Sequence, residues 1–154
     1  MKIGNRRNKE RGHTLVELSM LSVLFVIMAV LSLDVGYVLM GSEVNDRACR
    51  DAARAAAQGD NYATALRLAQ VAVIPHRADG VYVSSPTVDT AQFTYQDFGG
   101  DPPPNESPFV SVTTRANVRI PAPIFFLGSG FGQNGTMQFS KTYVFPIVKT
   151  QLFL

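Results

Sequence analysis

The segment that most constrains this chain is a long apolar stretch close to its N-terminus. No residue from 18 to 33 is charged, and Leu, Val, Ile, Met and Phe dominate this part of the sequence. Asp34 interrupts the stretch, and residues 35 to 42 are again uncharged. From Leu15 to Met40 the segment exceeds the roughly 20 residues that a helix needs to cross a bilayer, and a helix satisfies its own backbone hydrogen bonds there. We therefore predict a membrane-spanning helix.

Basic residues precede the apolar stretch and predict its orientation. Five of the first eleven residues are Lys or Arg, and Glu10 is the only acidic one among them. This charge pattern predicts a cytoplasmic N-terminus and an extracytoplasmic remainder, in a single-pass protein. Without residues 1–12 the chain carries nine basic and eleven acidic residues, so the formal net charge of +2 comes from the leader. We therefore expect no nucleic-acid partner.

Three kinds of N-terminus combine basic residues with an apolar helix. A secretory signal peptide is cut after the apolar region at a small-x-small site, and residues 30–34 lack that pattern. An uncleaved signal anchor keeps both parts, whereas a prepilin is cut before the apolar stretch and keeps the whole helix. Glu17 favours the prepilin, because a carboxylate among apolar residues at a membrane is costly and is usually functional.

The segment Gly12-His13-Thr14-Leu15-Val16-Glu17 resembles the type IV prepilin signature. The resemblance implies that an inner-membrane aspartyl peptidase cuts after Gly12, so that His13 becomes the first residue of the mature protein. It also implies that Glu17 pairs with the new terminal amine of a neighbouring subunit during assembly. A carboxylate and an ammonium buried together cost far less than either buried alone.

The region after the anchor narrows the resemblance. Asp34-Val35-Gly36-Tyr37, followed by the Ala-rich run of residues 50–57, is similar to TadE-like minor pilins. The similarity covers residues 12–59, under a third of the chain. It implies a pseudopilin or minor pilin in a bacterial inner membrane, taking part in assembly of a Tad-type pilus or secretion filament. The implied partners are the prepilin peptidase and other pilin or pseudopilin subunits.

We expect the helix to continue beyond the membrane. Ala and Arg are strong helix formers and are frequent up to Gln58, after which Gly59-Asp60-Asn61 is a stop signal. The domains expected are a leader at 1–12, a spanning and emerging helix at 13–58, and an extracytoplasmic α+β domain at 59–154. In the part of the helix outside the membrane, small residues recur at helical spacing and predict one face, formed by Ala48, Ala52, Ala55 and Ala56. The opposite face is predicted to be a solvated stripe of arginines, formed by Arg47, Arg50 and Arg54.

The remaining sequence predicts one short helix and several strands. The helix spans residues 61–73 and ends before Pro75. Strand character follows, because apolar and polar residues alternate and β-branched and aromatic residues are frequent. The predicted strands are 81–83, 91–98, 109–114, 117–120 and 137–148, with exposed loops at 99–105 and 128–132. The fold class is therefore α+β: a long N-terminal helix followed by a small antiparallel sheet.

No catalytic or metal site is expected. Cys49 is the only cysteine, so an intrachain disulfide is excluded and we predict a small buried residue on a helix. His76 has no partner at metal-ligand spacing and is predicted to lie on the surface. Four aspartates of the loop regions are too widely spaced for a calcium loop, namely Asp79, Asp89, Asp97 and Asp101. We expect a protein that is not an enzyme and that binds no cofactor.

Two alternatives remain open at this stage. The first is a pseudopilin of a type II secretion system or of another type IV pilus, which would share the anchor chemistry. The second is an unprocessed single-pass protein whose outer domain binds a ligand or acts catalytically. The start of the mature protein, at His13 or at Met1, separates the two.

Overall fold

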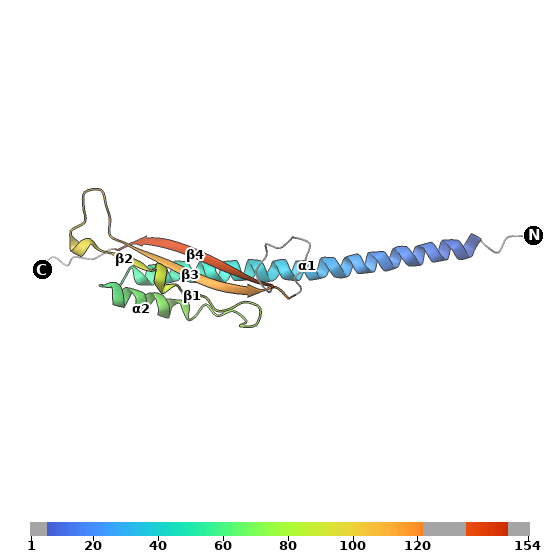
Figure 1. Ribbon diagram of the computed structural model, residues 1–154, viewed down its shortest axis with the longest axis horizontal. Helices are drawn as coiled ribbons and strands as arrows, with labels where there is room; N and C mark the ends of the chain where they lie inside the picture. The colour runs from blue at the N-terminus through green and yellow to red at the C-terminus, as the bar shows by residue number, and fades with distance from the viewer. Residues whose placement is uncertain (1–5, 122–134, 148–154) are drawn as a thin grey trace, which may run out of the picture.

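The computed structural model describes residues 6–121 and 135–147, with side chains from His13 onward. Its longest element is the helix α1, Arg6–Ala56, of 51 residues. At about 1.5 Å per residue this helix is about 76 Å long, and Figure 1 shows its N-terminal half projecting from the rest of the fold. No proline precedes Pro75, which explains how so long a helix runs without a break. The helix begins within the leader, earlier than the start predicted at residue 13.

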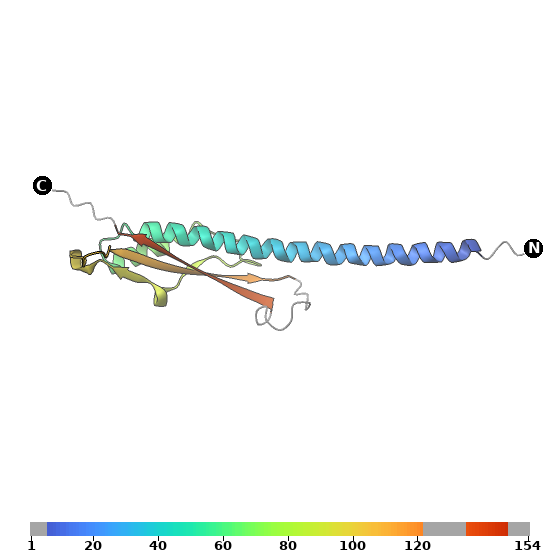
Figure 2. The same ribbon diagram turned by 90° about the horizontal axis from the view of Figure 1, so that it is seen from above.

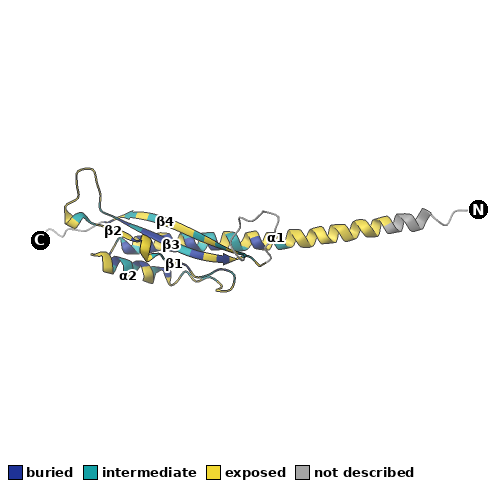
Figure 3. Cartoon of the chain, viewed as in Figure 1, coloured by how far each residue is buried: buried dark blue, intermediate teal, exposed yellow. Residues whose placement is uncertain are grey.

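The two halves of α1 have different surroundings. The projecting half exposes nearly all its large apolar side chains from Leu15 to Met40, and its length and composition are sufficient to cross a membrane (Figure 3). The second half packs against the domain and presents small side chains to it. Those with no exposed surface are Ala48, Ala52, Ala53 and Ala56. The predicted small-residue face is confirmed at three positions, whereas Ala55 is half-buried and Ala53 takes part instead.

The second helix, α2, spans Tyr62–Val73 and packs against α1. Asn61 caps it, because its side-chain oxygen accepts a hydrogen bond of 2.9 Å from the backbone N–H of Thr64. Gly59 permits the close turn between the helices, since a Cβ there would lie 2.6 Å from the Cα of Ala65. The predicted helix at 61–73 is confirmed.

The domain contains a four-stranded antiparallel sheet. Its strands are β1, Thr87–Val88; β2, Thr94–Gln96; β3, Phe109–Arg119; and β4, Thr136–Pro146. β3 is central: β4 pairs along its whole length, and β1 and β2 share its other edge. Both helices lie on one face of the sheet (Figures 1 and 2). The predicted α+β fold, with a long apolar helix and a small antiparallel sheet, is confirmed.

Alternate residues of β3 face the helices and form the centre of the core. Val110, Val112 and Val118 are fully buried on that side, together with small residues of α1 and α2. The opposite face is polar, as in sheets with one solvated side. On this face the hydroxyl groups of Thr113 and of Thr142 on β4 form a hydrogen bond of 2.8 Å.

Several strand predictions need correction. The strands predicted at 109–114 and 117–120 are one continuous strand, β3. Residues 91–98 contain only the short β2, which lies between the 3-10 turns η1, Thr90–Gln92, and η2, Phe98–Gly100. The run at 81–83 contributes a single bridge, between Val83 and Val118. The glycine-rich loop predicted at 128–132 lies outside the described residues.

Candidate functional site

The predicted processing site lies near the start of α1. The helical backbone begins at Arg6, so the peptide bond between Gly12 and His13 lies within a helix. Glycine destabilises a helix interior by about 1 kcal/mol relative to alanine. Gly12 is therefore expected to lower the stability of the helix at the predicted cleavage point.

One turn further on, Glu17 lies beside His13. The Oε1 of Glu17 is 3.3 Å from the Nε2 of His13, as expected for side chains four residues apart on a helix. Both side chains are open to the surroundings, with 61% of Glu17 and 78% of His13 exposed. The neighbours Leu15, Val16 and Leu18 are also exposed. A carboxylate thus stands on the outside of an otherwise apolar rod.

Asp34, the second carboxylate of the apolar stretch, is buried, unlike Glu17. Asp34 is only 8% exposed and is the first buried residue of α1 from His13 onward. In the sequence Asp34 interrupts the apolar run and begins the segment similar to TadE-like minor pilins, but its burial was not predicted. Because the protein itself shields Asp34 but not Glu17, the anchor has one carboxylate that is already enclosed and one that is not. The cost of placing a carboxylate in an apolar medium therefore falls on Glu17, whose neighbour in the fold is the exposed His13.

Two polar side chains fix α1 to the sheet. Asn45 is fully buried, and its Nδ2 donates to the backbone oxygens of Thr114 and Phe139, each at 3.4 Å. Cys49, one turn later, has its Sγ 3.3 Å from the backbone oxygen of Val112, and burial raises the pKa of its thiol. The prediction that Cys49 is a buried helical residue is confirmed. Asn45 also lies in the core, which was not predicted from the sequence.

The arginines of the predicted stripe are exposed, but each of them also contacts another side chain. The Nε of Arg50 donates to the hydroxyl of Tyr143 at 2.9 Å, and that hydroxyl donates to Asp46 at 2.9 Å. The hydrogen bond with Tyr143, with the charge of Asp46, raises the pKa of the Arg50 guanidinium. Arg54 lies over the ring of Phe145, and Arg47 pairs with Glu43. Arg50 and Arg54 therefore link α1 to β4, whereas Arg47 pairs within α1.

The histidine and aspartates of the domain serve local structure. His76, predicted on the surface, is half-buried, and its Nε2 lies 2.9 Å from Asp51 of α1. Asp89 pairs with Arg115 at 2.5 Å across the sheet. Within residues 13–121 and 135–147, no group of three metal-ligating side chains comes together.

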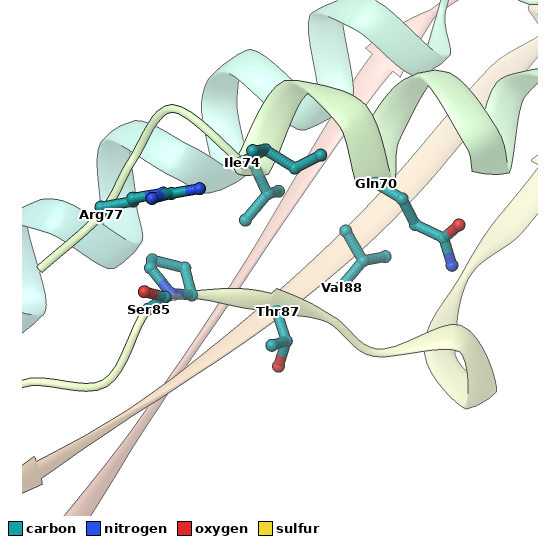
Figure 4. Close-up of a pocket in the computed structure, with 8 residues that line it drawn as sticks. Gln70, Ile74, Arg77, Ser85, Thr87 and Val88 are labelled. Atoms are coloured by element: carbon teal, nitrogen blue, oxygen red, sulfur yellow. The ribbon is translucent and has the colours of Figure 1, made fainter. Parts of the chain in front are cut away.

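A shallow groove lies between the end of α2 and β1 (Figure 4). Gln70, Ile74 and Val88 line it, and Arg77 is the only charged side chain among the lining residues. One cation beside apolar and hydroxyl groups supplies neither an acid-base pair nor a nucleophile with its base. The groove gives no positive support to a catalytic function.

Comparison of the chain with models of known protein families, with curated proteins and with solved structures finds no match. The similarity to TadE-like minor pilins therefore rests on residues 12–59 alone and stays a prediction.

Proposed function

We propose that this chain is a membrane-anchored minor pilin or pseudopilin that takes part in assembly of a Tad-type pilus or secretion filament. In this proposal α1 crosses the bacterial inner membrane once, with its N-terminus cytoplasmic and the sheet domain outside. A prepilin peptidase removes residues 1–12, and the protein then associates with other pilin or pseudopilin subunits.

The observation that carries the proposal is the difference between the two carboxylates of the anchor. The side chain of Glu17 is 61% exposed, whereas Asp34 as a whole residue is buried, at 8%. In the unprocessed chain the neighbour of Glu17 is the exposed His13. An ammonium group from an adjacent subunit would neutralise Glu17 within the membrane at much lower cost than leaving it unpaired. A solitary anchor gains nothing from such a residue.

The architecture of α1 supports the same function. The helix passes without a break from the apolar part into the domain, where Asn45 and Cys49 bond it to β3 and β4. Lateral packing of the apolar parts of neighbouring subunits would therefore also set the positions of their domains. A subunit built in this way suits a helical array.

Processing is tested by the N-terminus of the mature protein. The full chain is produced with and without a prepilin peptidase, and the membrane fraction is analysed by N-terminal sequencing and intact mass. We expect a mature chain that begins at His13 and lacks the mass of residues 1–12. A chain that still begins at Met1 in the presence of the cognate peptidase would contradict the proposal and favour an unprocessed single-pass protein.

Assembly is tested by Glu17→Ala. The variant is expected to insert into the membrane as well as the parent, because it removes a charge, but to be lost from sheared or cross-linked filaments. Glu43→Ala is the matched control, since Glu43 also has a partner four residues away on α1, Arg47, but outside the apolar stretch. Equal incorporation of both variants would remove the proposed role of Glu17.

A further inference from the structure

The fold covers α1 from Asp34 onward, near the end of the apolar stretch. The rings of Tyr37 on α1 and Tyr82 in the loop before β1 lie 4.7 Å apart between centroids. One turn further along α1, Gly41 packs against Val118 near the end of β3. Figure 1 shows β3 pointing toward the place where α1 leaves the domain. No exposed spacer therefore separates the apolar rod from the domain.

The length of the apolar part places this contact at a defined depth. Tyr37 lies 22 positions after Leu15, which is about 33 Å along the helix at about 1.5 Å per residue. The hydrocarbon core of a bilayer is about 30 Å thick. If Leu15 lies at one boundary of that core, Tyr37 and Tyr82 lie at the other. Tyrosine is a residue type that membrane proteins concentrate at such boundaries.

The side chains around this contact suit a lipid surface. Val81 is 67% exposed although it is apolar. Arg119 is also exposed, and its backbone N–H donates to the backbone oxygen of Tyr82 at 2.6 Å, which places Arg119 at the same end of the domain as Tyr82. An arginine can bind a phosphate through two parallel hydrogen bonds.

The loop that carries Val81 is held in shape. The carboxylate of Asp79 accepts hydrogen bonds from the backbone N–H groups of Val81, Tyr82 and Val83, at 3.1, 3.0 and 2.7 Å. Gly80 has a φ of 72°, a conformation that favours glycine. The negative charge of Asp79 is thus turned toward the loop backbone, and Val81 remains exposed at a fixed position.

We propose that Tyr37, Val81, Tyr82 and Arg119 form a membrane-facing rim that rests in the headgroup layer of the bilayer's outer leaflet. Val81 reaches the upper acyl chains, the two tyrosines lie at the boundary, and Arg119 binds lipid phosphate. This proposal rests on the membrane anchoring of the proposed function. It goes further in making the domain lie against the lipid surface instead of standing clear of it.

The chain contains no tryptophan, so single tryptophans can report depth without background. Three full-length variants are reconstituted in phosphatidylcholine vesicles. Val81→Trp probes the rim. Val144→Trp, at a site 59% exposed on β4, is the matched control, and Phe25→Trp, at a site 73% exposed on α1, probes the anchor. Fluorescence quenching is measured with lipids spin-labelled on the headgroup and with lipids brominated deep in the acyl chains.

We expect headgroup quenching of Val81→Trp to be several-fold stronger than that of Val144→Trp, and deep quenching to be strongest for Phe25→Trp. Equal, weak headgroup quenching of Val81→Trp and Val144→Trp, with Phe25→Trp still quenched, would overturn the rim and leave the anchor intact. Absence of deep quenching for Phe25→Trp would overturn the anchoring and the rim together.

Discussion

Gly41 of α1 lies so close to Val118 of β3 that a Cβ at position 41 would overlap with the Cγ2 of the valine. Only a residue without a side chain lets the helix approach the strand here. Gly36, one and a half turns earlier on α1, has nothing within 4 Å of the position that a Cβ would occupy. The same residue type therefore has opposite consequences at two neighbouring positions.

Gly41→Ala is expected to destabilise the domain by about 1–3 kcal/mol, because the helix or the strand must shift to admit the methyl group. Gly36→Ala is the control and should be neutral or stabilising by up to about 1 kcal/mol, since alanine is the better helix former. Denaturant unfolding in detergent micelles, followed by circular dichroism, measures both. Equal stabilities would show that the contact with Val118 does not limit the approach of α1.

Cys49 should be unreactive in the folded protein. It is fully buried, and the raised pKa of its thiol disfavours the nucleophilic thiolate. A maleimide reagent at neutral pH is expected to label the native protein slowly and the denatured protein completely, as measured by mass. A Lys141→Cys variant supplies an exposed comparison in the same chain. Rapid native labelling of Cys49 would mean that α1 separates readily from the sheet.

Tyr143→Phe tests the link between α1 and β4. The change removes a hydroxyl that joins Arg50 and Asp46, while the ring remains. We expect a loss of about 1 kcal/mol, the usual net value of a hydrogen bond in this setting. Tyr62→Phe, which keeps the edge-on ring contact with Phe93, serves as control. If both variants unfold at the same denaturant concentration as the parent, the contact of Arg50 with Tyr143 does not stabilise the fold.

Asp79 should make stability depend on pH. Hydrogen bonds from the backbone N–H groups of Val83, Val81 and Tyr82 hold the pKa of its carboxyl below the usual range. Its contribution is therefore present above the ordinary aspartate pKa of about 3.9 and is lost as the pH falls through the lowered pKa. Asp79→Ala should be less stable than the parent at neutral pH.

The difference should shrink when unfolding is measured at about pH 3, where part of the parent's carboxyl is protonated. Asp101→Ala, a change at an exposed loop position, should show no such trend. A gap between Asp79→Ala and the parent that grows on acidification would contradict the assigned hydrogen bonds.

The elements predicted well are those with local signals. The apolar run predicts the first part of α1, and Asn61 with Pro75 brackets α2, because capping and proline act within a few residues. Asp89 and Asp97 also carried a local signal, since each accepts a hydrogen bond from a backbone N–H two residues later, at the start of η1 and η2. Those turns replace most of the strand predicted at 91–98.

The features that could not be predicted depend on contacts far apart in the sequence. β3 is continuous because β4 pairs with it from Phe109 to Arg119, so the polar residues near its middle remain in the strand. The burial of Asn45 requires backbone oxygens of residues 114 and 139, about 69 and 94 positions away. The candidate site, in contrast, was partly predictable from local sequence. Glu17 was visible in the sequence, but its contrast with the shielded Asp34 needed the fold.

The unbroken course of α1 has a mechanical consequence. From Tyr37 to Ala56 the helix extends about 28 Å beyond the level of the rim, at about 1.5 Å per residue. The helix is continuous over this part, and it contains no proline. Membrane helices are tilted by about 20° on average, and such a tilt would displace the far end of the domain by about 10 Å. The outer part of α1 therefore follows the tilt of the anchor, and each increase of about 5° in tilt displaces Ala56 by about 2.5 Å relative to the rim.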